Sequence, residues 1–137
     1  MEINRVRNSS INMVIVLLDT SFILHMVSKP IVNFESLEEK LGKVEFVVLE
    51  DTIHELESLC HSKSVIKMRS AHSALNYAFR LMRVSIKGDE SVDDKIVRFA
   101  IEKGAIVATL DAELKRKLKR HGVPVITLKN DKIDVNT

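Results

Sequence analysis

The stretch Val14-Ile15-Val16-Leu17-Leu18-Asp19-Thr20-Ser21 decides the fold of this chain. Five apolar residues, three of them β-branched, run without alternation into a single acid. This pattern is typical of a strand that is buried on both faces of a parallel sheet. Asp19 should then lie at the carboxyl edge of that sheet, where open α/β sheets place their binding sites. An acid in this position can also simply cap the helix that follows.

Composition indicates one globular domain of ordinary size. The chain has 137 residues, of which 45% are hydrophobic and 29% charged, and this excludes disordered and collagen-like classes. A net charge of +2 does not by itself mark a nucleic-acid binder. The single cysteine, Cys60, rules out an intrachain disulfide and fits a reducing compartment, so we expect a cytoplasmic protein.

The ends of the chain are polar and aperiodic. We expect residues 1–12 to be a flexible leader, residues 13–129 to form the domain, and residues 130–137 to be a polar C-terminal tail. Met13 directly precedes the first strand, so either Met1 or Met13 can be the physiological start. The apolar run over residues 13–18 is far shorter than the roughly 20 residues of a membrane span, so no membrane association is expected.

Apolar strand patterns alternate with helical ones along the rest of the chain. The helical patterns cover residues 21–27, 33–41 with Asn33 as its cap, a segment opening with a Thr52 to Glu55 capping box, 65–82, 91–103 closed by Gly104, and 112–121. Strand patterns follow at 46–49, 84–86, 105–109 and 123–128. This order predicts a three-layer α/β/α sandwich around a mainly parallel, five-stranded sheet.

Four acids are expected at the carboxyl edge of this sheet: Asp19, Glu55, Asp93 and Asp111. Asp93 is the most informative, because at 100° per residue it falls on the apolar stripe of its helix, where a solvated acid has no reason to be. The adjacent Asp94 is rotated off that face and is placed to close a capping box with Ser91.

Each acid also has a purely structural interpretation. Asp19 and Asp111 can be helix N-caps, Glu55 can serve its capping box, and Asp93 can pair with a buried lysine. Helical phase does not separate Glu55 from Glu57. The convergence of four acids on one edge nevertheless favours a shared acidic metal site, because a divalent cation keeps several carboxylates ionised together.

In order and spacing these acids resemble the pattern of the PIN-domain nucleases. The resemblance runs from about residue 13 to residue 128. It rests on Leu18-Asp19-Thr20-Ser21, on Glu55-Leu56 followed by Leu59, on Asp93-Asp94-Lys95-Ile96 with Ala100, and on Thr109-Leu110-Asp111. Leu110 is a departure, because asparagine is common at that position in the family.

The resemblance implies metal-assisted hydrolysis of RNA phosphodiester bonds. Asp19, Asp93 and Asp111, with Glu55 directly or through water, would hold one or two Mg²⁺ or Mn²⁺ ions that activate water. The supporting hydroxyls and acid of such a site would be those of Thr20, Ser21, Thr109 and Asp94.

Two basic clusters are candidate RNA contacts. One comprises Lys63, Lys67 and Arg69 at the start of the long helix, and the other contains Lys115 and Arg116 on the helix after Asp111. Either cluster can also be an ordinary solvated face, and the first of them, close in sequence to the helix that carries Glu55, is the better candidate for phosphate contacts. Few aromatic residues are present, so RNA shape or a partner is expected to supply specificity.

Residues 107–118 and 122–126 look closest to the archaeal and eukaryotic branch of the family that matures ribosomal RNA. That branch implies a ribosome-assembly partner. The toxin ribonucleases of toxin–antitoxin pairs are a more distant match and would imply an antitoxin. The sequence also permits a PIN-like RNA-binding module with little or no cleavage, or a phosphotransfer domain. A homodimer through the apolar helix at Phe22-Ile23-Leu24 is compatible with the sequence as well.

Overall fold

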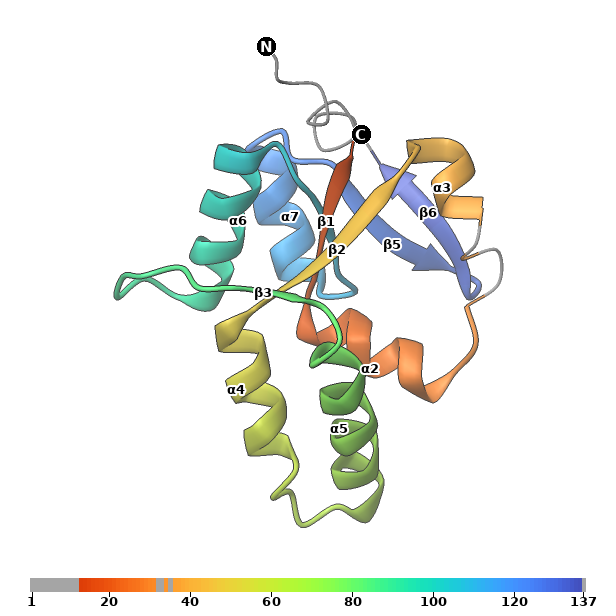
Figure 1. Ribbon diagram of the computed structural model, residues 1–137, viewed down its shortest axis with the longest axis vertical. Helices are drawn as coiled ribbons and strands as arrows, with labels where there is room; N and C mark the ends of the chain where they lie inside the picture. Colours follow the sequence, from red (N-terminus) through yellow and green to blue (C-terminus); the bar gives the residue numbers. More distant parts are fainter. Residues whose placement is uncertain (1–12, 32–33, 35, 137) are drawn as a thin grey trace.

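A computed structural model describes residues 13–31, 34 and 36–136, and the leader over residues 1–12 and the Asn33 cap lie outside this range. The chain folds as helices packed on both faces of one central sheet (Figure 1). This confirms the predicted α/β class. The elements, in chain order, are β1 (Val14–Leu18), α2 (Thr20–Ser28), α3 (Ser36–Leu41), β2 (Val44–Leu49), α4 (Glu50–Leu59), α5 (Val65–Ala78), β3 (Met82–Val84), α6 (Val92–Lys103), β4 (Ile106–Ala108), α7 (Ala112–Arg120), β5 (Val125–Lys129) and β6 (Lys132–Asn136).

The sheet has the strand order β3-β2-β1-β4-β5-β6, and every pairing is parallel except that of β5 with β6. From β1 the chain first adds strands on one side, β2 and then β3, and afterwards returns to add β4 on the other side. The direction of winding therefore reverses between β1 and β4. In open α/β sheets the crevice outside the carboxyl ends of two such strands is the usual ligand site.

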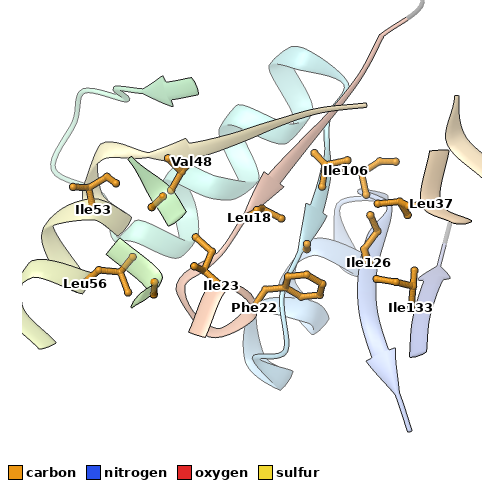
Figure 2. Close-up of a cluster of buried hydrophobic side chains, with 14 residues drawn as sticks. Leu18, Phe22, Ile23, Leu37, Val48, Ile53, Leu56, Ile106, Ile126 and Ile133 are labelled. Carbon is orange, nitrogen blue, oxygen red and sulfur yellow. The ribbon is translucent and has the colours of Figure 1, made fainter. Parts of the chain in front are cut away.

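Strand β1 is buried on both faces, as its unbroken apolar run predicts. Val16 and Leu18 pack with α2, α3, α4 and α5 on one face, and Leu17 packs with α6 and α7 on the other. Successive side chains of a strand point to opposite faces, so one five-residue strand anchors two hydrophobic cores. Figure 2 shows the first of these cores, where Phe22 and Ile23 of α2 meet Leu18.

The sheet has six strands, so the expected number of five was wrong. The extra strand, β6, comes from the segment expected to be a polar tail. Asn130 and Asp131 both adopt positive φ angles, of 55° and 62°, and thereby form the tight turn that folds β6 back onto β5. Ile133 alternates with polar neighbours and is buried, because β6 covers the core on one face only.

Two element boundaries also differ from expectation. Helix α5 ends at Ala78 instead of residue 82, and the edge strand β3 begins at Met82, two residues before the predicted strand. Phe79 and Met82, which the predicted helix over residues 65–82 includes, lie beyond its observed end and are 52% and 54% exposed. Pairing of Leu49 with Val84 sets the position of this edge strand, and helical periodicity contains no information about that pairing.

Helix α2 does not offer the expected apolar surface for a dimer. Phe22 is 1% exposed and Ile23 is fully buried, so both are used inside the core. No helix in the described part of the chain combines the length and the apolar character that crossing a membrane requires.

Candidate active site

Asp19 and Asp111 follow the two strands between which the winding of the sheet reverses. Asp19 comes directly after β1, Asp111 lies three residues after the end of β4, and Leu18 pairs with Ala108 across these strands. The backbone N–H of Asp19 donates to the carbonyl of Ala108 at 3.0 Å. The sheet therefore brings two carboxylates that are distant in sequence to one edge.

Asp19 is held by a network of short hydrogen bonds. Its Oδ1 accepts from the backbone N–H of Thr20 at 2.7 Å, so it caps α2. Its Oδ2 accepts from the hydroxyl of Thr109 at 2.6 Å and from that of Ser21 at 3.0 Å. Thr109 is fully buried, and this burial fixes the donor in place. The capping interpretation of Asp19 is therefore right, but it accounts for only one of the two carboxylate oxygens.

Asp111 is tied into the same network. Its Oδ1 accepts from the backbone N–H of Leu114 at 2.8 Å, which caps α7. Its own backbone N–H donates to the hydroxyl of Thr109 at 3.1 Å, and the N–H of Leu110 donates to the hydroxyl of Ser21 at 3.0 Å. Thr109 and Ser21 thus join the two strand ends. Leu110, which departs from the family pattern, contributes only its backbone to this network.

Glu55 does not form the expected capping box. Helix α4 begins at Glu50, directly after β2, without a side-chain cap, and Thr52 is buried inside the helix. Since the strand runs straight into the helix, the Thr52 to Glu55 spacing is coincidental. The Oε1 of Glu55 instead accepts from the hydroxyl of Thr20 at 2.8 Å. This contact separates Glu55 from Glu57, which helical phase could not do.

Asp93 lies in the first turn of α6 and faces the same edge. Burial raises the pKa of its carboxyl, and the charges of Asp111 and Asp19 raise that pKa further. Repulsion between like charges of this kind shows that the three carboxylates share one electrostatic environment.

Asp94 points elsewhere. Its backbone N–H donates to the hydroxyl of Ser91 at 3.1 Å, which is one half of the expected capping box. Its carboxylate accepts from the ammonium of Lys117 on α7 at 2.8 Å, and this hydrogen bond lowers the pKa of Asp94. Two adjacent acids thus have pKa values shifted in opposite directions, because Asp93 is partly buried beside other carboxylates and Asp94 accepts a hydrogen bond from a lysine.

A cleft of about 630 Å³ connects these groups, and we call it the acidic cleft. All four predicted acids line it. Asp51 and His54 line it as well, and neither was expected from the sequence. The positions of Asp51, His54 and Glu55, at i, i+3 and i+4 on α4, could have placed them on one helix face. The residues of the described ranges that line it are Asp19, Thr20, Ser21, Leu24, Asp51, His54, Glu55, Leu59, Val92, Asp93 and Asp111.

Asp51 differs from the other acids of the cleft because it has a cationic partner. The ammonium of Lys95 lies 3.0 Å from its Oδ2, and the lysine side chain is only 11% exposed. The pair joins α4 to α6 across the cleft. A largely buried lysine is therefore present beside the cleft, but it pairs with Asp51 and not with Asp93.

The donor set of the cleft suits a hard divalent cation. Carboxylate and hydroxyl oxygens surround it, and such ligands favour Mg²⁺ or Mn²⁺ over zinc. The raised pKa of Asp93 means that its ionised form is unfavourable in the folded protein. A cation among Asp19, Asp93 and Asp111 would stabilise that ionised form. Within the residues that the structure describes, no three acidic, histidine or cysteine side chains stand close enough to bind an ion without moving.

The predicted RNA contacts fall in two separate places. Lys63, Lys67 and Arg69 are exposed around the connection between α4 and α5, at the far end of the hairpin that these helices form (Figure 1). Lys115 and Arg116 line a second groove, beside α7. Neither group lines the acidic cleft.

Comparison with known proteins agrees with this geometry. Residues 16–131 match the family model described as a PIN like domain. Ribonuclease VapC9 of Archaeoglobus fulgidus is 31% identical over 135 residues, which cover 96% of this chain and 94% of that protein. Ribonuclease VapC4 of Methanocaldococcus jannaschii is 33% identical over 124 residues, which cover 83% of this chain and 89% of that protein.

Solved structures support the same grouping. The PIN domain endonuclease Utp24 superimposes with a TM-score of 0.68 at 28% identity, over 88% of this chain and 90% of that one. A domain of a functionally unknown protein from Methanocaldococcus jannaschii, at 18% identity and a TM-score of 0.58, shares the fold. The family match and the two ribonuclease relatives cover most of the chain, and this chain therefore belongs to the PIN-domain nuclease family.

Proposed function

We propose that this protein is a metal-dependent endoribonuclease and that the acidic cleft is its active site. The observation that carries the proposal is the convergence of four carboxylates, from the ends of β1 and β4 and from α4 and α6, on one cleft where the winding of the sheet reverses. Two relatives that match most of the chain are named ribonucleases, which supports RNA as the substrate.

Asp19, Asp93 and Asp111 would hold one or two Mg²⁺ or Mn²⁺ ions, with Glu55 bound directly or through water. When bound, such an ion activates water and stabilises the negative charge that develops on the scissile phosphate. Asp19 and Asp111 each cap a helix through Oδ1, and these hydrogen bonds hold both carboxylates in place at the cleft. In the described part of the chain, the Oδ2 of Asp111 accepts no hydrogen bond from protein.

Three hydroxyl groups orient the proposed ligands. Thr109 and Ser21 donate to the Oδ2 of Asp19, and Thr20 donates to the Oε1 of Glu55. Hydrogen bonds of this kind hold a ligand in its binding orientation, and losing one typically costs 10- to 100-fold in metal affinity or activity. Asp94 is not one of these supports, because its carboxylate pairs with Lys117 and does not line the acidic cleft.

Lys63, Lys67 and Arg69 are proposed to contact RNA phosphates away from the cut. They are exposed, and helix α4 separates them from the sheet by up to about 15 Å at 1.5 Å per residue. An RNA strand bound in the acidic cleft could reach these three residues only by running along the helical hairpin of α4 and α5. Their contribution would be electrostatic and sensitive to salt.

We further propose that the physiological substrate is a ribosomal RNA precursor, cut in the cytoplasm with a ribosome-assembly factor as partner. Residues 107–118 and 122–126 carry the sequence resemblance to that branch, and this resemblance supports the proposal. A toxin ribonuclease would instead be expected beside a small antitoxin gene. Growth arrest on expression that is relieved by the neighbouring gene would replace the ribosomal role with the toxin role.

The adjacent acids of α6 provide the test of cleavage. Labelled single-stranded RNA and ribosomal precursor RNA are incubated with Mn²⁺ or Mg²⁺, with a chelator as the control. The wild type and Asp94→Asn should cut, whereas Asp93→Asn should bind RNA without cutting it. Equal cleavage by Asp93→Asn would exclude Asp93 from the active site. RNA binding without cleavage by the wild type would favour a binding module.

A further inference from the structure

Helix α7 presents cations on two opposite sides. Lys117 faces α6, where Asp94 neutralises it at 2.8 Å. Lys115, Arg116 and Lys119 lie on the other side, with positions i, i+1 and i+4 of the helix. Between these two sides, Leu114 and Leu118 pack into the core beneath the helix. Lys115, Arg116 and Lys119 are therefore available to bind an anionic ligand, whereas Lys117 is already paired with Asp94.

Lys115, Arg116 and Lys119 line a groove of about 370 Å³ between α7 and the pair of strands β5 and β6, and we call it the basic groove. Aliphatic side chains and backbone form its base, and the hydroxyl of Thr127 and the amide of Asn136 add hydrogen-bonding groups. The described residues that line it are Ala112, Lys115, Arg116, Lys119, Gly122, Val123, Val125, Thr127 and Asn136.

No carboxylate among the described residues compensates the charge in the basic groove. No acidic side chain is among its lining residues, and in the described ranges none of its three cations forms an ion pair with a carboxylate. Lys115 makes only a long hydrogen bond, at 3.4 Å, to the hydroxyl of Thr127. Three cations without a carboxylate partner among the described residues, beside hydroxyl and amide groups, fit a ligand that carries successive phosphates.

Consecutive residues at the start of α7 line the acidic cleft and the basic groove. Asp111 lines the acidic cleft and the next residue, Ala112, lines the basic groove. Consecutive α-carbons are about 3.8 Å apart, so the two sites are neighbours across the first turn of α7. An RNA strand that places one phosphate beside Asp111 can therefore place a following phosphate in the basic groove.

We propose that the basic groove binds the phosphate backbone of the RNA strand immediately beside the bond that is cut, an inference that rests on the proposed function. The groove offsets the repulsion that an RNA strand meets at a cleft lined by several carboxylates. Among the described residues that line it, none has an aromatic side chain on which a base could stack. The groove therefore contacts the backbone and does not discriminate between sequences.

Salt-dependent binding tests this inference directly. The full chain, kept in chelator so that RNA stays intact, is titrated against a fluorescein-labelled single-stranded RNA at several salt concentrations. The groove variant is Lys115→Gln with Arg116→Gln and Lys119→Gln. The matched control, with the same change of charge, is Lys40→Gln with Lys43→Gln and Lys103→Gln, all exposed and outside both sites.

We expect the groove variant to bind RNA at least tenfold more weakly at low salt. The slope of log affinity against log salt should fall by about 2, since each phosphate contact on a single strand contributes about 0.7. The control should keep the slope of the wild type. Arg116→Gln alone is the second variant if the triple change unfolds the chain, and it should reduce the slope by about 0.7.

The outcomes separate this inference from the proposed function. A groove variant whose affinity and slope equal those of the control overturns the inference, whether or not the wild type cuts RNA. A reduced slope in a protein that never cuts RNA supports the groove and contradicts the nuclease proposal. With an active wild type, the groove variant should need more RNA for half-maximal cleavage while its maximal rate stays near that of the wild type.

Discussion

The acidic cleft and the basic groove lie on two sides of the start of α7, but they are built differently. In the cleft, short side chains at strand ends are fixed by hydrogen bonds as short as 2.6 Å, with a fully buried threonine among the donors. In the groove, long lysine and arginine side chains stand on a helix with few partners. Fixed geometry suits the positioning of a reacting phosphate, whereas flexible cations suit the attraction of a charged strand.

Removing a carboxylate from the acidic cleft should have the largest effect. Asp19→Asn keeps a side-chain oxygen that can cap α2, so the fold should persist. We expect cleavage of labelled RNA to fall more than about 100-fold, beyond the range seen when only a supporting hydrogen bond is lost. A variant that unfolds, judged by circular dichroism, would show that the capping role dominates instead.

Weakening the support of the cleft should have a smaller effect. Thr109→Val removes the donor to Asp19 and leaves both the Asp19 oxygen and the N–H of Asp111 without this partner. We expect a loss of about 1–3 kcal/mol in the free energy of unfolding, measured with denaturant, and about a tenfold loss of cleavage. Thr109→Ser retains the hydroxyl and should restore most of both. Equal activity of Thr109→Val and wild type would remove Thr109 from the site.

Neutralising one acid of the cleft should stabilise the fold at neutral pH. Because the pKa of Asp93 is raised in the folded state, the native protein binds this proton more tightly than the unfolded chain does. Ionised Asp93 therefore opposes folding above its raised pKa, and this effect disappears as the pH falls toward its ordinary value of about 4. Thermal melts without metal should show Asp93→Asn more stable than wild type at pH 7, with a difference that narrows in acid.

The smallest effect is expected for Asp94→Asn, a substitution outside both sites, and it is an effect on stability. Asp94→Asn removes a solvent-exposed ion pair with Lys117, and such pairs contribute little to stability. The lowered pKa of Asp94 means that this contribution is present above the ordinary carboxyl range and is lost as the pH falls through the lowered value. Melting temperatures of this variant and the wild type should agree closely at pH 7. A large loss would give the pair a structural importance that its exposure does not suggest.

The features that came correctly from the sequence are those set by local pattern. The apolar run ending at Asp19 predicted a doubly buried strand, and the apolar phase of α6 predicted that Asp93 and not Asp94 faces the cleft. The capping patterns at Ser91 and Gly104 correctly predicted where α6 begins and ends. Each of these signals depends on a few neighbouring residues.

The features that were missed depend on contacts between distant segments. Strand β6 exists because the turn at Asn130 and Asp131 returns it to β5, although its alternating pattern was visible in the sequence. Asp51 is an exception, because its spacing from Glu55 was visible in the sequence, and it was missed since the expected capping box at Thr52 placed it before the start of the helix. The bond from Thr20 to Glu55 spans 35 positions, and no local pattern predicts it.

Metal binding by the adjacent acids of α6 tests the central claim most directly. Isothermal titration of Mn²⁺ into the wild type, Asp93→Asn and Asp94→Asn, without RNA, separates the two carboxylates while changing charge equally. We predict that the wild type and Asp94→Asn bind Mn²⁺ with similar affinity and that Asp93→Asn binds it at least about tenfold more weakly. Equal binding by all three proteins, or loss in Asp94→Asn alone, would contradict a metal site in the acidic cleft.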